Sequence, residues 1–567
     1  MNVINVENKN ILKKTIKLLN PYKKYIVYII LCMIVSCLIS MILPLVNKEL
    51  MDNGLIEKNI KVIINLCIVN FVLLLVEQII IIFETKFESY VSVMMPYNLN
   101  KKAFKHLLEL KIGYFNEKNF AEIMNNINID ISNVCKISDR TSFFLMIEIF
   151  RMIGGLIGLI IIDYKLTALI LLIIPIRYTI VNYFAKKRKE LFQKYMEYNR
   201  DYSAWYGDTI SGIKEIKLWG LETIKTGQFI KKQRNIVKIN IRMFFLDKIN
   251  EILETLIFQI IVNSLYIIGG YMLMKSNITV GSLLAFITYS TYVTSPISSI
   301  LNIKYNFSNV IPSAKRLFQF LDTDCETFKG LHINDINKNH LNIQFENVSF
   351  YYNKDKIILN NINIKIDKGE KIAIIGENGS GKSTLINLFL RLYKPCKGKI
   401  LINGTNINDF NLKEYRKLIS VVNQEIYLFN QTIKENIILN SRIKEKQLNK
   451  IYKNAKLNEF INKLPNKSET NVGRNGSNLS GGEKQKIAMA RALARGSEIL
   501  ILDEATANLD IQSENYINQL INKEFREKTV IVISHRTDIL KYMDKVFELK
   551  NGQVNQIELY DILKKLS

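Results

Sequence analysis

Leu479-Ser480-Gly481-Gly482-Glu483 is the most informative run of residues in this chain because of the segments on either side of it. Upstream, residues 376–384 read GENGSGKST, which matches the phosphate-loop pattern G-x-x-x-x-G-K-[ST]. Downstream, residues 499–504 read ILILDE, an apolar strand that ends in two carboxylates. A phosphate loop alone indicates that a nucleotide binds, and the three segments in this order indicate a more specific machine.

The phosphate loop has the sequence context that its chemistry needs. Residues 372–375 form a buried strand that runs into the loop, and a helix is predicted to follow it. Glycines allow backbone N–H groups to surround phosphates, and the helix adds its N-terminal dipole. Lys382 supplies a positive charge for the β- and γ-phosphates, and the Ser383 hydroxyl is suited to Mg²⁺. A glycine-rich turn without a ligand is the alternative, which the complete pattern disfavours.

The three segments together resemble the ATP-binding-cassette (ABC) family. In that family the Leu-Ser-Gly-Gly segment of one subunit closes over ATP that the phosphate loop of another subunit holds. The resemblance therefore implies ATP and Mg²⁺ as cofactors and a second subunit as partner. The implied ATP-binding residues are Tyr352, Glu377, Asn378, Gly379, Ser380, Gly381, Lys382, Ser383, Thr384, Ser480, Gly481, Gly482 and Glu483. Ser383, Gln424 and Asp503 are the implied Mg²⁺ ligands, directly or through water.

The resemblance also assigns catalytic roles. Glu504 matches the general base that polarises the attacking water, and Gln424 matches the glutamine that contacts this water and Mg²⁺. His535, which follows an apolar strand at 530–533, matches the histidine that senses the γ-phosphate. Tyr352 stands where an aromatic ring stacks on adenine. Its neighbour Tyr351 is the second choice for this role, and an ordinary strand tyrosine remains the alternative.

The first 305 residues carry the apolar mass of the chain. A membrane-spanning helix needs roughly 20 mostly apolar residues. Six segments qualify: Tyr25–Val46, Val62–Phe83, Ser142–Ile162, Leu166–Phe184, Ile252–Met274 and Val280–Leu301. The third and fourth are separated only by residues 163–165, which predicts a tight hairpin. The first segment lacks a small-residue cleavage site, so it is interpreted as a retained anchor, not a signal peptide.

Two long polar segments, after the second and fourth spans, are interpreted as helical extensions. Basic residues lie in both, including the run KKRK at 186–189, so the positive-inside rule places these segments and both termini in the cytoplasm of a multi-pass cell-membrane protein. Six spans with two such excursions resemble the exporter-type membrane domain of the ABC family, whose excursions end in coupling helices. Residues 212–220 match the second coupling segment, and residues 115–122 match the first more loosely.

Charged residues also fall inside the predicted spans, where ionisable groups are costly. Glu148 and Arg151 are three residues apart on one helical face and can pair with each other. Glu77 and Glu254 have no partner nearby in the sequence, and we interpret them as candidates for contacting a cationic part of the cargo.

Two positions depart from the family pattern. Arg474 stands where exporters often have a glutamate, so contact with the coupling helices is expected to differ. Residues 507–508 read Ala-Asn where Ser-Ala is usual, while Asp510 is retained.

The composition disfavours nucleic acid as a partner. The 567 residues include 77 Lys and Arg against 52 Asp and Glu, a net charge of +25. This excess is spread along the chain and forms no basic stripe interleaved with aromatic residues. The six cysteines form no CxxC pair, which argues against a disulfide framework or a zinc site.

The sequence thus predicts a multi-domain fold. An N-terminal segment (1–19) precedes an all-α six-span domain (20–305), a linker (306–340) and an α/β P-loop ATPase domain with a helical subdomain (341–567). The predicted function is ATP-driven efflux of a hydrophobic or amphipathic cargo such as a peptide, lipid or drug. One chain carries half of the working unit, so a homodimer is expected, with a heterodimer as the alternative. A metal-chelate importer and an ATP-gated channel or regulator remain the alternative functions.

Overall fold

A computed structural model describes residues 2–116, 120–275, 278–296, 310–333, 341–352, 356–503, 519–521, 523–534 and 538–558. The chain divides into two compact units. The membrane unit comprises residues 1–108 and 120–323, and the ATPase unit comprises residues 109–119 and 324–567. Each unit is described by itself below.

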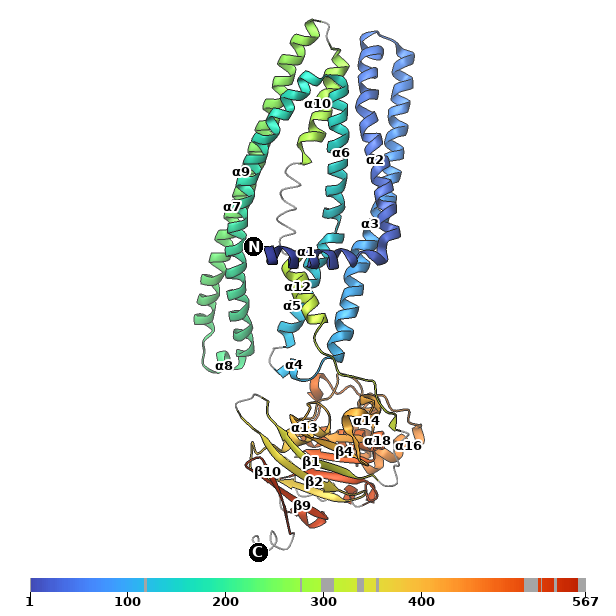
Figure 1. The fold of residues 1–567 in the computed structure, drawn as a ribbon, viewed down its shortest axis with the longest axis vertical. Coiled ribbons are helices and arrows are strands. Elements are labelled where there is room, and N and C mark those ends of the chain that lie inside the picture. The colour runs from blue at the N-terminus through green and yellow to red at the C-terminus, as the bar shows by residue number, and fades with distance from the viewer. Residues whose placement is uncertain are drawn as a thin grey trace. The chain divides into compact units, whose positions relative to one another are not determined.

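The membrane unit is helical (Figure 1). Its helices are α1 (Asn2–Lys17), α2 (Lys23–Glu49), α3 (Ile60–Glu109), α5 (Phe120–Cys135), α6 (Arg140–Ile162), α7 (Tyr164–Ser211), α8 (Ile213–Leu218), α9 (Glu222–Met274), α10 (Val280–Thr294) and α12 (Val310–Leu321). Within the described residues, five helices are long and apolar enough to cross a membrane. The sixth predicted span is α10 as far as Thr294, and residues 297–309 lie outside the described part of the chain.

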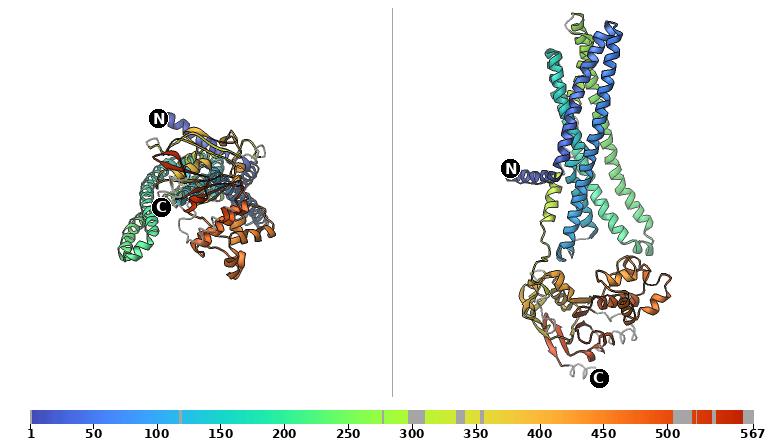
Figure 2. Two further views of the ribbon diagram at one scale, coloured as in Figure 1. Left: turned by 90° about the horizontal axis from the view of Figure 1, so that it is seen from below. Right: turned by 90° about the vertical axis from the view of Figure 1, so that its right-hand side faces the viewer.

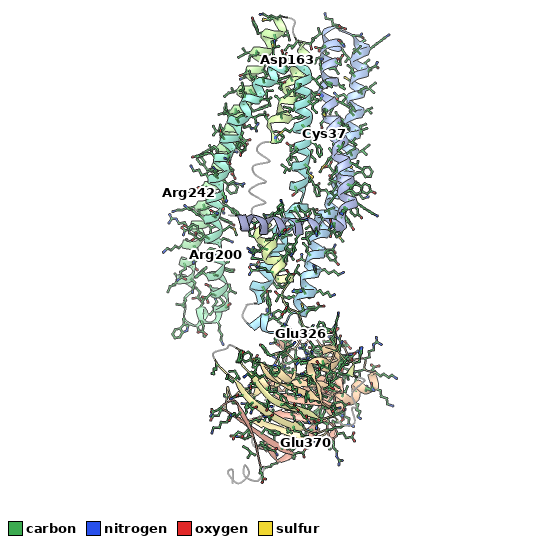
Figure 3. The ribbon with its side chains drawn as sticks, viewed as in Figure 1. Cys37, Asp163, Arg200, Arg242, Glu326 and Glu370 are labelled. Carbon is green, nitrogen blue, oxygen red and sulfur yellow. The ribbon has the colours of Figure 1, made fainter. Side chains whose placement is uncertain are left out.

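The long polar segments are helical, as the sequence predicted. Helix α3 continues through Glu109, and α7 and α9 extend well beyond their apolar parts to the short helix α8. Figures 1 and 2 show α7 and α9 side by side along their length. The predicted hairpin between the third and fourth spans forms at Asp163, labelled in Figure 3. The Asp163 carboxylate caps α7 by accepting from the backbone N–H groups of Lys165 and Leu166, both at 2.8 Å.

Helices α2, α6 and α10 pack closely because small residues occupy their crossings. A Cβ on Gly158 of α6 would lie 2.7 Å from the ring of Tyr289 on α10, so this position requires glycine. The Tyr289 hydroxyl donates to the carbonyl oxygen of Met41 on α2, which satisfies the polar end of a buried ring. Cys37, labelled in Figure 3, similarly donates its thiol to the Phe150 carbonyl at 3.3 Å.

The structure corrects the interpretation of Glu77 and Glu254 as carboxylates without partners. Glu254 pairs with Arg177 of the neighbouring helix at 3.1 Å, and both side chains are largely buried. Glu77 lies 3.9 Å from Arg151, which also pairs with Glu148 at 3.8 Å, as the sequence spacing suggested. The sequence could not show the two inter-helix pairs because their members lie about 75 residues apart along the chain. The pairs offset the cost of burying charge, so neither carboxylate is left over for a cargo cation.

Part of the predicted linker is a helix. Helix α12 occupies residues Val310–Leu321 and packs against α5 within the membrane unit. Arg316 of α12 forms a bidentate ion pair with Asp130 of α5, whose residue is 5% exposed. The sequence suggested a linker here because the mixed polarity of these residues hides an amphipathic helix with one buried face.

The ATPase unit contains two sheets. The strands are β1 (Ile343–Phe350), β2 (Leu359–Ile366), β3 (Lys371–Ile375), β4 (Lys397–Ile402), β5 (Thr405–Asn406), β6 (Ile419–Val422), β7 (Ile499–Asp503), β8 (Thr529–Ile533), β9 (Lys545–Lys550) and β10 (Gln553–Ile557). The described strands form an antiparallel sheet in the order β2-β1-β4-β5 and a mostly parallel sheet in the order β10-β9-β3-β8-β7-β6. An apolar core lies between the sheets and includes one face of the parallel sheet.

The helices of this unit complete the layers. They are α4 (Gly113–Asn116), α13 (Lys382–Phe389), α14 (Leu412–Lys417), α15 (Ile433–Ile438), α16 (Glu445–Asn454), α17 (Asn458–Lys463) and α18 (Gly481–Arg495). Helix α18 contributes to a second core on the other face of the parallel sheet. It also contributes to a third core with α15, α16 and α17, which constitutes the helical subdomain. Strand β7 is buried along its apolar residues, as expected for a parallel strand covered on both faces.

Candidate nucleotide site

The parallel sheet brings the predicted nucleotide segments to one edge. Strands β3, β8, β7 and β6 are adjacent and parallel, so their carboxyl ends point the same way. Their register aligns Ile533 with both Ile374 and Asp503. The phosphate loop, Asp503 and the loop that carries Gln424 therefore begin at the same edge of the sheet. Ligands of open α/β sheets bind outside the carboxyl ends of the strands, so this edge is the candidate site.

The phosphate loop has the backbone that its glycines permit. Gly376, Gly379 and Gly381 have φ angles of 154°, 80° and 107°. A Cβ on Gly376 would lie 2.3 Å from the Leu549 carbonyl oxygen, so any side chain there would collide with backbone. Helix α13 starts directly after Gly381, and its free N–H groups face the loop. The loop therefore forms a cradle with a helix N-terminus at its base.

The donor groups of the cradle fit a phosphate. The Lys382 ammonium is 5% exposed and donates to the carbonyl oxygens of Gly376 and Glu377, at 2.8 and 2.9 Å, which holds it across the loop. The Ser380 hydroxyl oxygen is buried and has no hydrogen-bond partner among the described residues. An orphaned buried polar atom is costly, and an anion in the loop would satisfy it. Glu377, Asn378 and Ser383 are exposed around this cradle.

Tyr352 presents an aromatic face next to the cradle. Its ring is 48% exposed and makes edge contacts with Phe350 and Tyr393, at centroid distances of 4.9 and 5.1 Å. Its hydroxyl lies 3.2 Å from the Thr384 hydroxyl on α13. Tyr351 is less exposed. Tyr393 supports Tyr352 from the side, and a Cβ on Gly113 of α4 would lie 3.8 Å from the Tyr393 ring. The sequence analysis missed Tyr393 because no motif marks it.

The predicted signature segment caps α18. The Ser480 N–H donates to the Glu483 carboxylate at 2.7 Å, and the Glu483 N–H approaches the Ser480 hydroxyl oxygen at 3.4 Å, which forms a capping box. Helix α18 starts at Gly481, three residues before the predicted start. Cβ atoms on Gly481 and Gly482 would meet no described atom within 4 Å. The segment is therefore an open helix N-terminus whose serine hydroxyl hydrogen remains available for donation.

The metal and catalytic residues are described only in part. Ser383 and Gln424 are exposed, and Asp503, at the end of β7, is partly exposed. No cluster of three or more His, Cys, Asp or Glu that could hold a metal occurs in the described part of the chain. This donor set suits Mg²⁺, which is usually held by one or two side chains together with substrate phosphates and water. Glu504 and His535 lie outside the described residues.

The first predicted coupling segment belongs to the ATPase unit. Residues 109–119 cluster with this unit, and α4 lies within them. Leu110 forms an antiparallel bridge with Cys325, and Lys111 pairs with Asp324 at 3.0 Å. Residues 117–119 of the predicted segment lie outside the described residues, and Arg474 is exposed in a 3₁₀ turn before the signature.

Comparisons with known proteins agree with this architecture. The ABC transporter transmembrane region matches residues 26–297, and the ABC transporter ATPase family matches residues 359–507. An ATP-dependent lipid A-core flippase of Pasteurella multocida is 28% identical over 96% of this chain and 94% of its own length. A Bacillus subtilis ATP-binding/permease protein, provisionally named for multidrug export, is 27% identical over 98% of this chain and 97% of its own.

A solved structure shares the fold. The ATP-bound structure of a bacterial Atm1-family ABC exporter superposes with a TM-score of 0.80, covering 96% of this chain and 97% of the other, at 22% identity. Its helical membrane domain followed by an α/β nucleotide-binding domain is the arrangement described above. The two family matches in one chain, and the relatives that cover nearly all of it, determine the assignment. The chain belongs to the ABC transporter family as an exporter-type half-transporter, a multi-pass membrane protein whose fused ATPase domain couples ATP hydrolysis to transport.

Proposed function

We propose that this chain forms a homodimer that exports a hydrophobic or amphipathic molecule, with a lipid or a drug-like compound as the favoured cargo. The names of the relatives support this cargo class, since they refer to lipid A-core and to multidrug export. The ATPase unit, the long helical extensions and both termini lie on the cytoplasmic side in this proposal, because the basic residues concentrate there.

The observation that carries the proposal is the convergence of three strand ends on one phosphate loop. The loop amides, Lys382 and Ser380 bind the phosphates, and Ser383, Gln424 and Asp503 hold Mg²⁺. ATP bound in this site supplies the phosphoryl group, and Mg²⁺ neutralises charge that develops on it. Glu504 accepts a proton from the attacking water, and His535 contacts the γ-phosphate.

The second copy supplies the signature segment. Ser480, Gly481 and Gly482 form an open helix N-terminus that suits the γ-phosphate of an ATP bound to the partner. ATP then stabilises the closed dimer, and hydrolysis removes that stabilisation. A closed state favoured by ATP shifts the membrane domains between inward- and outward-facing states by its differential binding free energy.

ATP hydrolysis by the full chain in lipid nanodiscs tests this proposal. Wild type and Glu504→Gln are compared while a lipid A analogue, a cationic dye and a hydrophobic peptide are titrated separately. We expect activity that disappears in Glu504→Gln and rises with the lipid or the dye. Wild-type protein without ATPase activity would contradict the homodimer, and stimulation by the peptide alone would contradict the favoured cargo.

A further inference from the structure

Arg416 lies where the chain enters the ATPase domain. It is on α14, and its guanidinium forms a bidentate ion pair with Glu326, with N–O distances of 2.7 and 3.0 Å. The Arg416 side chain is 29% exposed and that of Glu326 is 14% exposed. A two-pronged pair that is shielded in this way fixes both geometry and distance, unlike a surface pair. Glu326, labelled in Figure 3, is therefore firmly attached to α14.

The same guanidinium holds the end of the phosphate-loop helix. Arg416 donates to the carbonyl oxygens of Leu390 and Arg391, both at 3.2 Å, at the C-terminal end of α13. The last carbonyls of a helix lack partners within the helix and carry partial negative charge, so a cation stabilises them. Helix α13 begins at the phosphate loop, and Arg416 therefore contacts the opposite end of a helix whose N-terminus faces the nucleotide.

The signature helix ends at the same residue. Arg495, the last residue of α18, donates through its guanidinium to the backbone carbonyl of Arg416. The C-terminal ends of α13 and α18 thus both contact Arg416. The N-termini of these two helices carry the phosphate loop and the signature segment, and α14 connects them at their far ends.

The segment that Arg416 grips is bonded to the end of α3. The Glu326 N–H donates to the carbonyl oxygen of Glu109, the last residue of α3, at 2.7 Å. Leu110 and Cys325 form the adjacent antiparallel bridge. This entry ribbon, residues 109–111 with residues 324–326, is covalently continuous with α3 on one strand and with α12 on the other. A movement of Arg416 is therefore passed to both helices by short, directional bonds.

We propose that Arg416 is a positioning residue that couples the nucleotide state of α13 and α18 to α3 and α12 through Glu326. This proposal rests on the function proposed above. It gives the chain a transmission route that is separate from the coupling helices α4 and α8. A purely structural ion pair would hold the domain together without affecting how strongly nucleotide moves the membrane helices, and this difference can be measured.

The test uses the full-length dimer in nanodiscs, with its six cysteines replaced and a spin label at Lys165→Cys in each protomer. The distance between labels is measured without nucleotide and with Mg-ATP and orthovanadate. Glu326→Ala breaks the pair and leaves Arg416 on the helix ends. Asp324→Ala is the matched control, because it removes the exposed Lys111 pair from the same ribbon. ATPase kcat and KM are recorded for each variant.

We expect Glu326→Ala to keep the KM for ATP within about 3-fold of wild type, because the pair does not touch the phosphate loop. The nucleotide-induced change in the ratio of the two label distances should fall about 5- to 30-fold, the range for losing an interaction of this kind. Asp324→Ala should respond like wild type, and Arg416→Lys, which keeps charge and loses the fork, should be intermediate.

Three outcomes would overturn the proposal. Glu326→Ala could respond like wild type, or Asp324→Ala could lose the response equally, or Glu326→Ala could lose ATP affinity and response together, which indicates structural damage. A wild-type protein that hydrolyses ATP without any distance change also contradicts the coupling route. Wild-type protein that hydrolyses no ATP instead contradicts the function on which this inference rests.

Discussion

Asn436 is the residue whose substitution should most clearly separate the loop after Gln424 from the signature helix. It is fully buried on α15, and its side-chain oxygen accepts from the Phe429 N–H at 2.9 Å and from the Arg491 guanidinium at 2.7 Å. Arg491 belongs to α18 and donates also to the carbonyl of Tyr427, at 2.8 Å. The side chain of Asn436 therefore joins the loop at 427–432 to α18.

The cost of Asn436→Ala follows from which partners are left unpaired. The Phe429 carbonyl keeps the Gln431 N–H at 2.7 Å, and Arg491 keeps its bond to the Asn436 backbone carbonyl at 2.6 Å. The Phe429 N–H and one guanidinium N–H lose their acceptor. Each buried orphan costs about 1–3 kcal/mol, so we expect local stability to fall by about 2–5 kcal/mol. A tenfold change corresponds to about 1.4 kcal/mol, which predicts amide exchange at least about 30-fold faster.

Hydrogen exchange with mass spectrometry on the full-length protein in nanodiscs measures this effect on peptides spanning 427–439. Lys434→Ala is the control on the same helix, because it removes the exposed pair with Glu469 and should change exchange by about 2-fold or less. ATPase activity should also fall in Asn436→Ala, since the loop that follows Gln424 loses its attachment to α18. Exchange in Asn436→Ala that stays as slow as in Lys434→Ala would refute the reasoning.

Three further predictions concern other parts of the chain. Tyr352→Ala should raise the KM for ATP about 10-fold, since stacking on a base contributes about 1–3 kcal/mol, while Tyr352→Trp should stay near wild type in steady-state kinetics. Gly158→Ala should lower the thermal midpoint in detergent, because its Cβ would collide with the Tyr289 ring, and Gly270→Ala, whose Cβ meets no described atom, should not. The Glu435 carboxylate accepts from the N-cap N–H of α15, which lowers its pKa. Its stabilising effect is therefore present above its ordinary pKa and lost as pH falls through the lowered value, so exchange at the start of α15 should differ between wild type and Glu435→Gln near neutral pH and converge in acid.

The site motifs could be predicted because they are local. The phosphate loop, the signature and the strand ending at Asp503 each depend on a short run of residues whose backbone geometry their own glycines and apolar residues impose. The five described spans could be predicted for the same reason, since apolar length is a property of consecutive residues. Strand boundaries also followed closely, with β3 observed at Lys371–Ile375 as predicted.

The pairs across helices could not be predicted. Glu254 was interpreted as free because Arg177 is distant in sequence, and only the packing of α7 on α9 brings them together. The helix α12 was interpreted as linker, because its buried face is recognised only once α5 supplies a partner for it. Tyr393, Arg416 and Asn436 belong to no motif and were missed altogether.

The sequence by itself determined the class of machine, the nucleotide segments and the membrane spans, because each depends on the residue type at a fixed spacing along one stretch of chain. The tertiary structure alone decided which segments meet. It aligned the ends of β3, β7 and β6 at one edge, and it brought the ends of α13 and α18 onto Arg416 together with Glu326. Contacts of this kind depend on packing between residues far apart in the chain, and no local pattern of charge or hydrophobicity specifies which partner a buried Arg or Glu will have.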